Sequence, residues 1–326
     1  MAVKRSFPQY LLVSLKGLAM GAADVVPGVS GGTIAFIAGI YEELITTIDQ
    51  LDVGFFKMWK KEGFRTAFSV YNIGFLVALF GGIAVSILSL AKLITFLLHD
   101  YPLLLWGFFF GLIIASILYI GKQITHWGAG VIISGIIGIA ISYYITIAEP
   151  VHSPSSYLFI FISGFIAIIA MILPGISGSF ILLLLGSYAV VLGTVRNFVD
   201  GIIATDWALV KTSALKLALF LVGCIVGLKV FSKALTYLFK NYQNLTLSLL
   251  TGFMIGALNK VWPWKEVLSY REDSHGEMVP LLEKSILPSA FDGDPKLFWV
   301  IVVTIIGFLT IFLLERFAKT KPGHAN

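Results

Sequence analysis

Two segments of one pattern carry the groups that could bind an anion. The first is PGVSGG at residues 27–32, and the second is PGISGS at residues 174–179. Proline and glycine break a helix, and a helix that begins after such a break presents unpaired N–H groups and the positive end of its dipole. Serine and threonine hydroxyls beside those amides can donate further hydrogen bonds to a phosphate. The segments therefore predict a two-sided anion site, formed by Pro27, Gly28, Ser30, Gly31, Gly32 and Thr33 from the first and by Pro174, Gly175, Ser177, Gly178 and Ser179 from the second.

A second interpretation of these segments needs no ligand, because glycine lets helices pack closely and serine can cap a helix end. We favour binding because the pattern occurs twice within long apolar stretches. Amides freed by a broken membrane helix are tolerated only where they are buried in protein or line a water-filled cavity.

Charged residues near the two segments are further candidates. Asp24 lies three residues before the first segment, and Met171 holds the corresponding place before the second. An acidic residue inside a membrane is a functional candidate: Asp24 could accept a proton, orient a hydroxyl, pair with Lys16 or cap a helix end. Lys92 and Lys233 occupy matching positions and either snorkel to the membrane interface or, like Lys16, attract a phosphate.

The composition is that of an integral membrane protein. Hydrophobic residues make up 58% of the chain and charged residues 13%, and the mean hydropathy is +0.92, well beyond the usual soluble domain. Charge-free windows near the ~20 residues that cross a bilayer are residues 70–91, 101–121, 127–148, 241–259 and 297–314, and a sixth span, 212–239, is interrupted by lysines. No removable signal peptide is predicted.

Several classes of function are disfavoured. The net charge of +5 comes from bases at the ends of apolar spans, a pattern of membrane topology and not of nucleic-acid binding. Cys224 is the single cysteine, so no disulfide within the chain and no CxxC site can form, and the five histidines are scattered. The sequence implies no metal and no cofactor.

The chain reads as a duplication. A shift of 147 positions places Gly17 on Gly164 and the first segment on the second, and beyond the next loop a shift of 141 places Gly82 on Gly223. Residues 153–195 carry no charge and would be about 64 Å long as one helix, twice the bilayer core, so this stretch must turn back. We expect an all-α polytopic membrane protein with two repeats, 1–148 and 149–326, each made of a re-entrant helical hairpin and three transmembrane helices.

Three crossings per repeat would invert the second repeat relative to the first. The basic residues then gather on one face, which the positive-inside rule makes cytoplasmic together with both termini. The opposite face would carry the loop 261–295, whose part from residue 263 to 295 has seven acidic and three basic residues.

At residues 17–45 and 171–188 the chain resembles the PopT-like family of bacterial polyprenyl-phosphate transporters. The resemblance implies that undecaprenyl phosphate, the carrier lipid of envelope polysaccharide synthesis, is returned across the bacterial cytoplasmic membrane for reuse. Its partners would be this lipid, the surrounding membrane lipids and a coupling ion, either a proton or sodium. Two inverted halves rocking around a central site would give alternating access.

Two other functions stay open. The segments also resemble those of undecaprenyl-pyrophosphate phosphatases, but Gly178 stands where that family's PGxSRS motif has arginine. No guanidinium would then stabilise a pyrophosphate in the transition state, so we rank the enzyme below the transporter. An anion channel or exchanger would give conductance or coupled ion flux without moving lipid.

Overall fold

The computed structural model describes residues 5–26, 29–151, 156–272 and 278–319. Pro27 and Gly28 of the first segment lie outside these residues. The first half of the chain forms the helices α1 (Phe7–Asp24), α2 (Gly31–Ile37), α3 (Tyr41–Gln50), α4 (Val53–Glu62), α5 (Phe64–Val70), α6 (Ile73–Asp100), α7 (Pro102–Gly121) and α8 (Ala129–Ile147).

The second half forms further short and long helices and a small sheet. Its elements are α9 (Tyr157–Ile172), α10 (Gly178–Leu184), α11 (Tyr188–Ile203), α12 (Trp207–Asn241), α13 (Gln243–Val261), β1 (Lys265–Glu272), β2 (Met278–Ser285), the 3₁₀ turn η1 (Pro288–Ala290) and α14 (Leu297–Lys319).

The prediction of a largely helical membrane protein is confirmed. Four helices of the described residues are long and apolar enough to cross a membrane: α6 over Ile73–Leu90, α7, α8 and α12. The bent pair α10 and α11, with 104° between its helices, would make a fifth if it were one span, and α9 and Leu297–Phe312 of α14 are shorter apolar helices.

The predicted span 241–259 coincides with α13, which is a core helix. Its buried residues include the polar Thr246, Ser248 and Thr251, and it packs against α7 and α8. A helix buried on most of its surface by other helices tolerates such hydroxyls because they find partners, as Ser248 does by donating to the Val131 carbonyl at 2.7 Å.

The loop predicted at 261–295 contains secondary structure that the all-α prediction lacked. Strands β1 and β2 pair antiparallel, with Lys265 opposite Ser285 and Glu272 opposite Met278. Half-buried and exposed residues alternate along residues 265–271 of β1, as in a strand with one face against the protein, and its cationic side chains rest on aromatic rings of the helical body. The prediction missed this hairpin because those rings belong to distant helices.

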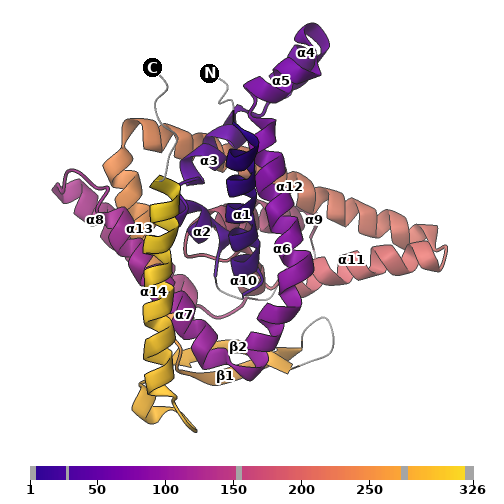
Figure 1. Cartoon of the computed structure of the whole chain (residues 1–326). Coiled ribbons are helices and arrows are strands. Elements are labelled where there is room, and N and C mark those ends of the chain that lie inside the picture. The colour runs from indigo at the N-terminus through magenta and orange to yellow at the C-terminus, as the bar shows by residue number, and fades with distance from the viewer. Residues whose placement is uncertain (1–4, 27–28, 152–155, 273–277, 320–326) are drawn as a thin grey trace.

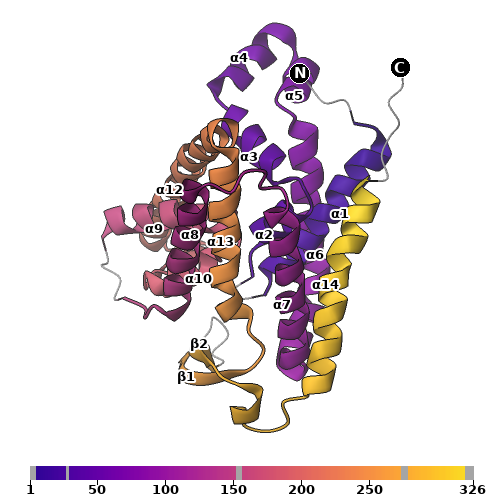
Figure 2. The same ribbon diagram turned by 90° about the vertical axis from the view of Figure 1, so that its left-hand side faces the viewer.

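The helices run between two ends of the molecule. Helix α1 begins and α14 ends at one end, and the β1–β2 hairpin lies at the opposite end (Figures 1 and 2). Helices α4 and α5 project beyond the first end, and α11 and α12 extend to one side of the body (Figure 1). The short helix α2 lies in the middle, and every one of its residues is buried. Residues 29–32 of the first segment are buried as well and lie in the core of the protein.

Candidate functional site

The two predicted breaks lie against each other. Ser30 donates through Oγ toward the carbonyls of Met171 and Leu173, at 3.2 and 3.3 Å. In return, the N–H of Gly175 donates to Thr33 Oγ1 at 2.8 Å. Segments about 140 residues apart in sequence thus form one contact in the core.

Close approach at this contact requires glycine. A Cβ atom built on Gly32 would lie 2.4 Å from the carbonyl oxygen of Ile172, far inside van der Waals contact. On the other side, Gly175 has φ of +86°, a backbone conformation that favours glycine. Both residues therefore fix the geometry of the breaks.

The amides at the start of α2 are occupied by the protein itself. The N–H of Gly31 donates to Asp24 Oδ1 at 2.6 Å, and the N–H of Gly32 donates to Ser30 Oγ at 3.1 Å. The N–H of Thr33 donates to the Ser30 carbonyl at 2.9 Å. A carboxylate of the chain therefore stands where the sequence predicts an incoming anion, and of the roles left open for Asp24 the structure displays that of a helix cap.

Lys16 lies at the other end of the same short helix. Its Nζ donates to the Ala38 carbonyl at 2.7 Å, and Ala38 is the C-cap of α2. Helix α1 thus supplies an anion, Asp24, to the positive end of α2 and a cation to its negative end, which is the arrangement that the helix dipole favours. In this structure Lys16 binds the helix end and not Asp24.

The second break is more open than the first. No side chain caps α10 at its N-cap, Ser177. The hydroxyls of Ser177 and Ser179 lie 2.9 Å apart, and Ser179 and Met171 are exposed while Ser177 and Pro174 are buried. Gly178 lies so close to α9 that its Cβ would be 2.7 Å from the Ala167 carbonyl oxygen. The exposed part of the contact between the breaks is therefore on the side of the second break.

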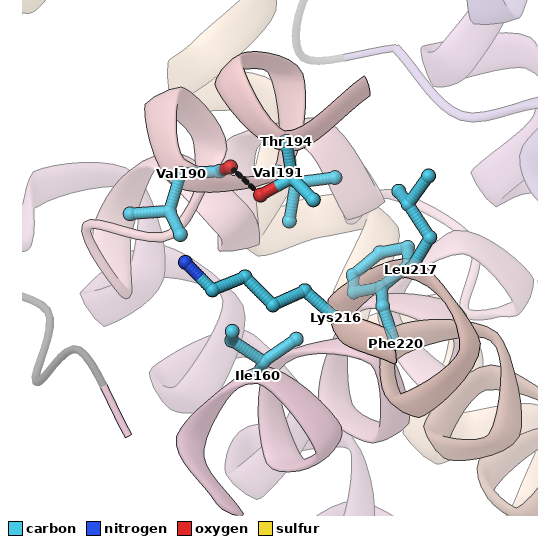
Figure 3. Close-up of a pocket in the computed structure, with 7 residues that line it drawn as sticks. All are labelled: Ile160, Val190, Val191, Thr194, Lys216, Leu217 and Phe220. Carbon is cyan, nitrogen blue, oxygen red and sulfur yellow. Dashed lines mark hydrogen bonds between the residues drawn. The ribbon is translucent and has the colours of Figure 1, made fainter. Parts of the chain in front are cut away.

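The remaining predicted lysines lie apart from the breaks. Lys92 on α6 and Lys233 on α12 are both exposed. A small pocket between α9, α11 and α12 instead receives another lysine, Lys216, whose amine reaches past Val190 (Figure 3). Its lining is apolar apart from this amine and one hydroxyl, and consists of Ile160, Val190, Val191, Thr194, Lys216, Leu217 and Phe220.

Sequence reasoning missed a lysine that contacts the helix of the second break. Lys260 at the end of α13 has its Nζ 4.8 Å from the ring centroid of Phe180, the residue that follows Ser179. A base at the end of an apolar span is read as an interfacial residue, and nothing local in the sequence indicates that the ring of Phe180 lies beneath it.

Comparison with known proteins identifies the family. Residues 20–279 match the model of the VCA0040-like family, described as undecaprenyl phosphate translocase-like. The chain belongs to this family. It is 46% identical over 314 residues to a polyprenyl-phosphate transporter of Vibrio cholerae, covering 95% of this chain and 97% of the relative.

A second relative is more distant. The chain is 35% identical over 266 residues to a polyprenyl-phosphate transporter of Staphylococcus aureus, which covers 76% of this chain and 85% of that protein. No solved structure gives a significant match. Family membership thus confirms the resemblance drawn from the two segments, and the geometry of the site comes from this chain alone.

Proposed function

We propose that this protein is a translocase that moves a polyprenyl phosphate, undecaprenyl phosphate in the first instance, across the bacterial cytoplasmic membrane for recycling, and that it is not an enzyme. The observation that carries the proposal is the 46% identity over nearly the whole chain to a protein named polyprenyl-phosphate transporter. The contact between two broken helices supports it, because such breaks hold the binding sites of many transporters.

We propose that both breaks belong to re-entrant hairpins. Arg5, just before α1, donates to Glu43 in the first turn of α3 at 2.6 Å, so the chain has returned to its starting end by α3. Similarly, the N–H of Val151, which precedes α9, donates to the carbonyl of Leu184 at the end of α10 at 2.8 Å. Each segment then enters and leaves the membrane on one side.

Matched packing supports the duplication. Gly17 on α1 faces the carbonyl of Leu79 on α6, where a Cβ would lie 2.2 Å from the oxygen, and Gly164 on α9 faces that of Phe220 on α12 at 2.3 Å. These partners differ by the same shifts of 147 and 141 that align the sequence. The helix pair α7 and α14 has its counterpart in α13 and α8, so the halves exchange their last helices.

The inverted arrangement gives a path for transport. We propose that the end bearing α4 and α5, where α1 begins and α14 ends, faces the cytoplasm with both termini, and that the β1–β2 hairpin faces the opposite side. The phosphate would bind between the breaks, to the residues predicted from the sequence, while the polyprenyl tail stays in the lipid. Rocking of the halves would expose the contact to either side in turn.

Asp24 must leave its place at the start of α2 before a phosphate can bind there. While its carboxylate holds the N–H of Gly31, the start of α2 cannot receive a phosphate, because two anions would compete for one donor. We propose that Asp24 leaves Gly31 when it takes up the coupling ion, a proton or sodium, and that the phosphate then replaces it.

Reconstitution tests the function directly. The purified protein is placed in liposomes with labelled undecaprenyl phosphate in one leaflet, and its appearance in the other leaflet is followed with time. Phosphate release from undecaprenyl pyrophosphate and ion conductance are recorded in parallel. Leaflet exchange without either is the expected result, whereas catalytic phosphate release or conductance without lipid movement would show an enzyme or a channel.

A further inference from the structure

Beneath the β1–β2 hairpin two lysines share one carboxylate. Lys260 Nζ lies 3.0 Å from Glu283 Oε2, and Lys265 Nζ lies 3.5 Å from the same oxygen. The three side chains are 14%, 7% and 18% exposed for Lys260, Lys265 and Glu283. With both amines protonated, this lysine cluster of Lys260, Lys265 and Glu283 holds one positive charge in excess.

Lys265 is the member whose hydrogen-bonding capacity is least used. Its Nζ is buried and, among the described residues, finds no hydrogen-bond acceptor. It lies 3.7 Å from the ring centroid of Trp106, a cation–π contact that compensates part of the charge. An ammonium carries three donors, and a buried donor without an acceptor costs free energy. The cluster therefore has unused donors that could bind another hydrogen-bond acceptor.

The cluster contacts α10, the helix that begins at the second break. Lys260 stacks on Phe180 of α10, Lys265 on Trp106 of α7, and Arg271 of β1 on Tyr188, with its Cζ 4.9 Å from the ring centroid. The hairpin thus contacts α7 and α11 through Lys265 and Arg271, and it lies at its end of the molecule (Figure 1). Lys260 at the end of α13, and Lys265 and Arg271 of β1, are thus each next to an aromatic residue of α10, α7 or α11.

We propose that Lys260 and Lys265 form a binding site for a phosphomonoester group at the mouth of the second break, and that Glu283 occupies this site until the phosphate displaces it. The inference rests on the proposed function, in which the β1–β2 hairpin faces the side from which the lipid is taken up. A phosphate has more acceptor oxygens and more charge than one carboxylate, so it can satisfy donors of both lysines at once. Phe180, on which Lys260 rests, directly follows Ser179, whose hydroxyl lies 2.9 Å from that of Ser177.

The same residues could instead only hold the hairpin against α13. The direction in which Glu283→Gln changes phosphate affinity separates the two roles. If Glu283 competes with the ligand, Glu283→Gln leaves two lysines without a counterion and tightens phosphate binding. If Glu283 only fastens the hairpin to α13, the same change loosens the hairpin and weakens binding together with the lysine variants.

The test measures binding of farnesyl phosphate and of inorganic phosphate to the full chain in detergent, with farnesol as the uncharged control. Lys260→Met and Lys265→Met are each expected to weaken farnesyl phosphate binding at least about tenfold, the usual effect of losing one charge-assisted contact. Glu283→Gln is expected to tighten it several-fold. Lys284→Met is the matched control, since Lys284 is an exposed lysine on β2 outside the cluster, and should leave affinity unchanged.

The outcomes are separable. Equal dependence of both probes on the lysines identifies a site for phosphate itself, and dependence confined to farnesyl phosphate identifies a site for lipid heads. Unchanged affinity in both lysine variants, or weaker binding in Glu283→Gln, overturns the proposal. Leaflet exchange by the unaltered protein is measured in the same preparations: intact exchange with an insensitive cluster refutes only this site, whereas absent exchange refutes the function.

Discussion

The contact between the two breaks makes a sharp prediction for Gly32→Ala. The added Cβ would stand 2.4 Å from the carbonyl oxygen of Ile172, so one break has to withdraw by about 1 Å to restore van der Waals distance. Overpacking of this kind costs about 1–3 kcal/mol. The withdrawal also stretches the hydrogen bonds of Ser30 and Gly175 across the contact, each with a net value of about 0.5–1.5 kcal/mol.

The closed contact should therefore lose about 2–6 kcal/mol, a factor of roughly 30 or more in its population. If the breaks must close around the phosphate in every cycle, leaflet exchange in liposomes falls at least tenfold while the protein still inserts. Gly81→Ala is the matched control, because a Cβ on Gly81 of α6 meets nothing within 4 Å. Equal exchange rates for the two variants would refute the reasoning that close apposition of the breaks is part of transport.

Three further predictions follow from charged side chains. Asp24→Asn keeps an acceptor for Gly31 but no titratable group, so exchange should lose the pH dependence that Asp24 gives it below neutral pH, where the lysine cluster stays protonated. An unaltered pH profile in that range would remove proton coupling. Burial lowers the pKa of Lys265 from 10.5 to about 8, although the nearby Glu283 raises it. Farnesyl phosphate binding should therefore weaken as pH rises through about 8, whereas the affinity of Lys265→Arg should stay constant up to pH 10. Lys229→Met removes an amine that donates to three carbonyls at the end of α3 and should destabilise the fold by about 1.5–3 kcal/mol, measured as a lower melting temperature than that of Lys211→Met, an exposed lysine on the same helix.

Deprotonation of Lys265 should change phosphate binding and folding stability in opposite directions. Its folded-state pKa lies below that of an exposed lysine, so between about pH 8 and 10.5 the unfolded chain holds the proton more often than the folded chain does. By linkage, the contribution of Lys265 to stability rises with pH across this window. Weaker phosphate binding in the same window therefore reflects the loss of positive charge and not a loosening of the hairpin.

Sequence reasoning located the breaks because their signal is local. Proline and glycine interrupt a helix wherever they occur, and the apolar stretches around them are visible in any window of the chain. The same reasoning could not see that Asp24 caps α2, because this depends on how the chain turns between α1 and α2. It could not find the acceptors of Lys229 either, since these carbonyls are about 180 residues away in sequence. Contacts between residues of the two halves can be recognised only once the three-dimensional structure is known.

The two breaks are alike in sequence and unlike in charge, and this difference bears on direction. At the first break the start of α2 is closed by the carboxylate of Asp24, whose counterpart at the second break is Met171, which has no charge. The second break has an uncapped helix start and the excess positive charge of the lysine cluster beside Phe180. A phosphate arriving from the β1–β2 end would meet the cations and the exposed hydroxyl of Ser179 first, whereas one arriving from the opposite end would have to compete with a carboxylate. If the two halves expose the contact to each side of the membrane in turn, this asymmetry makes capture of the phosphate from the β1–β2 end the easier step. Removing the negative charge of the first break with Asp24→Asn and replacing a positive charge beside the second with Lys265→Glu should therefore shift net uptake toward the other leaflet.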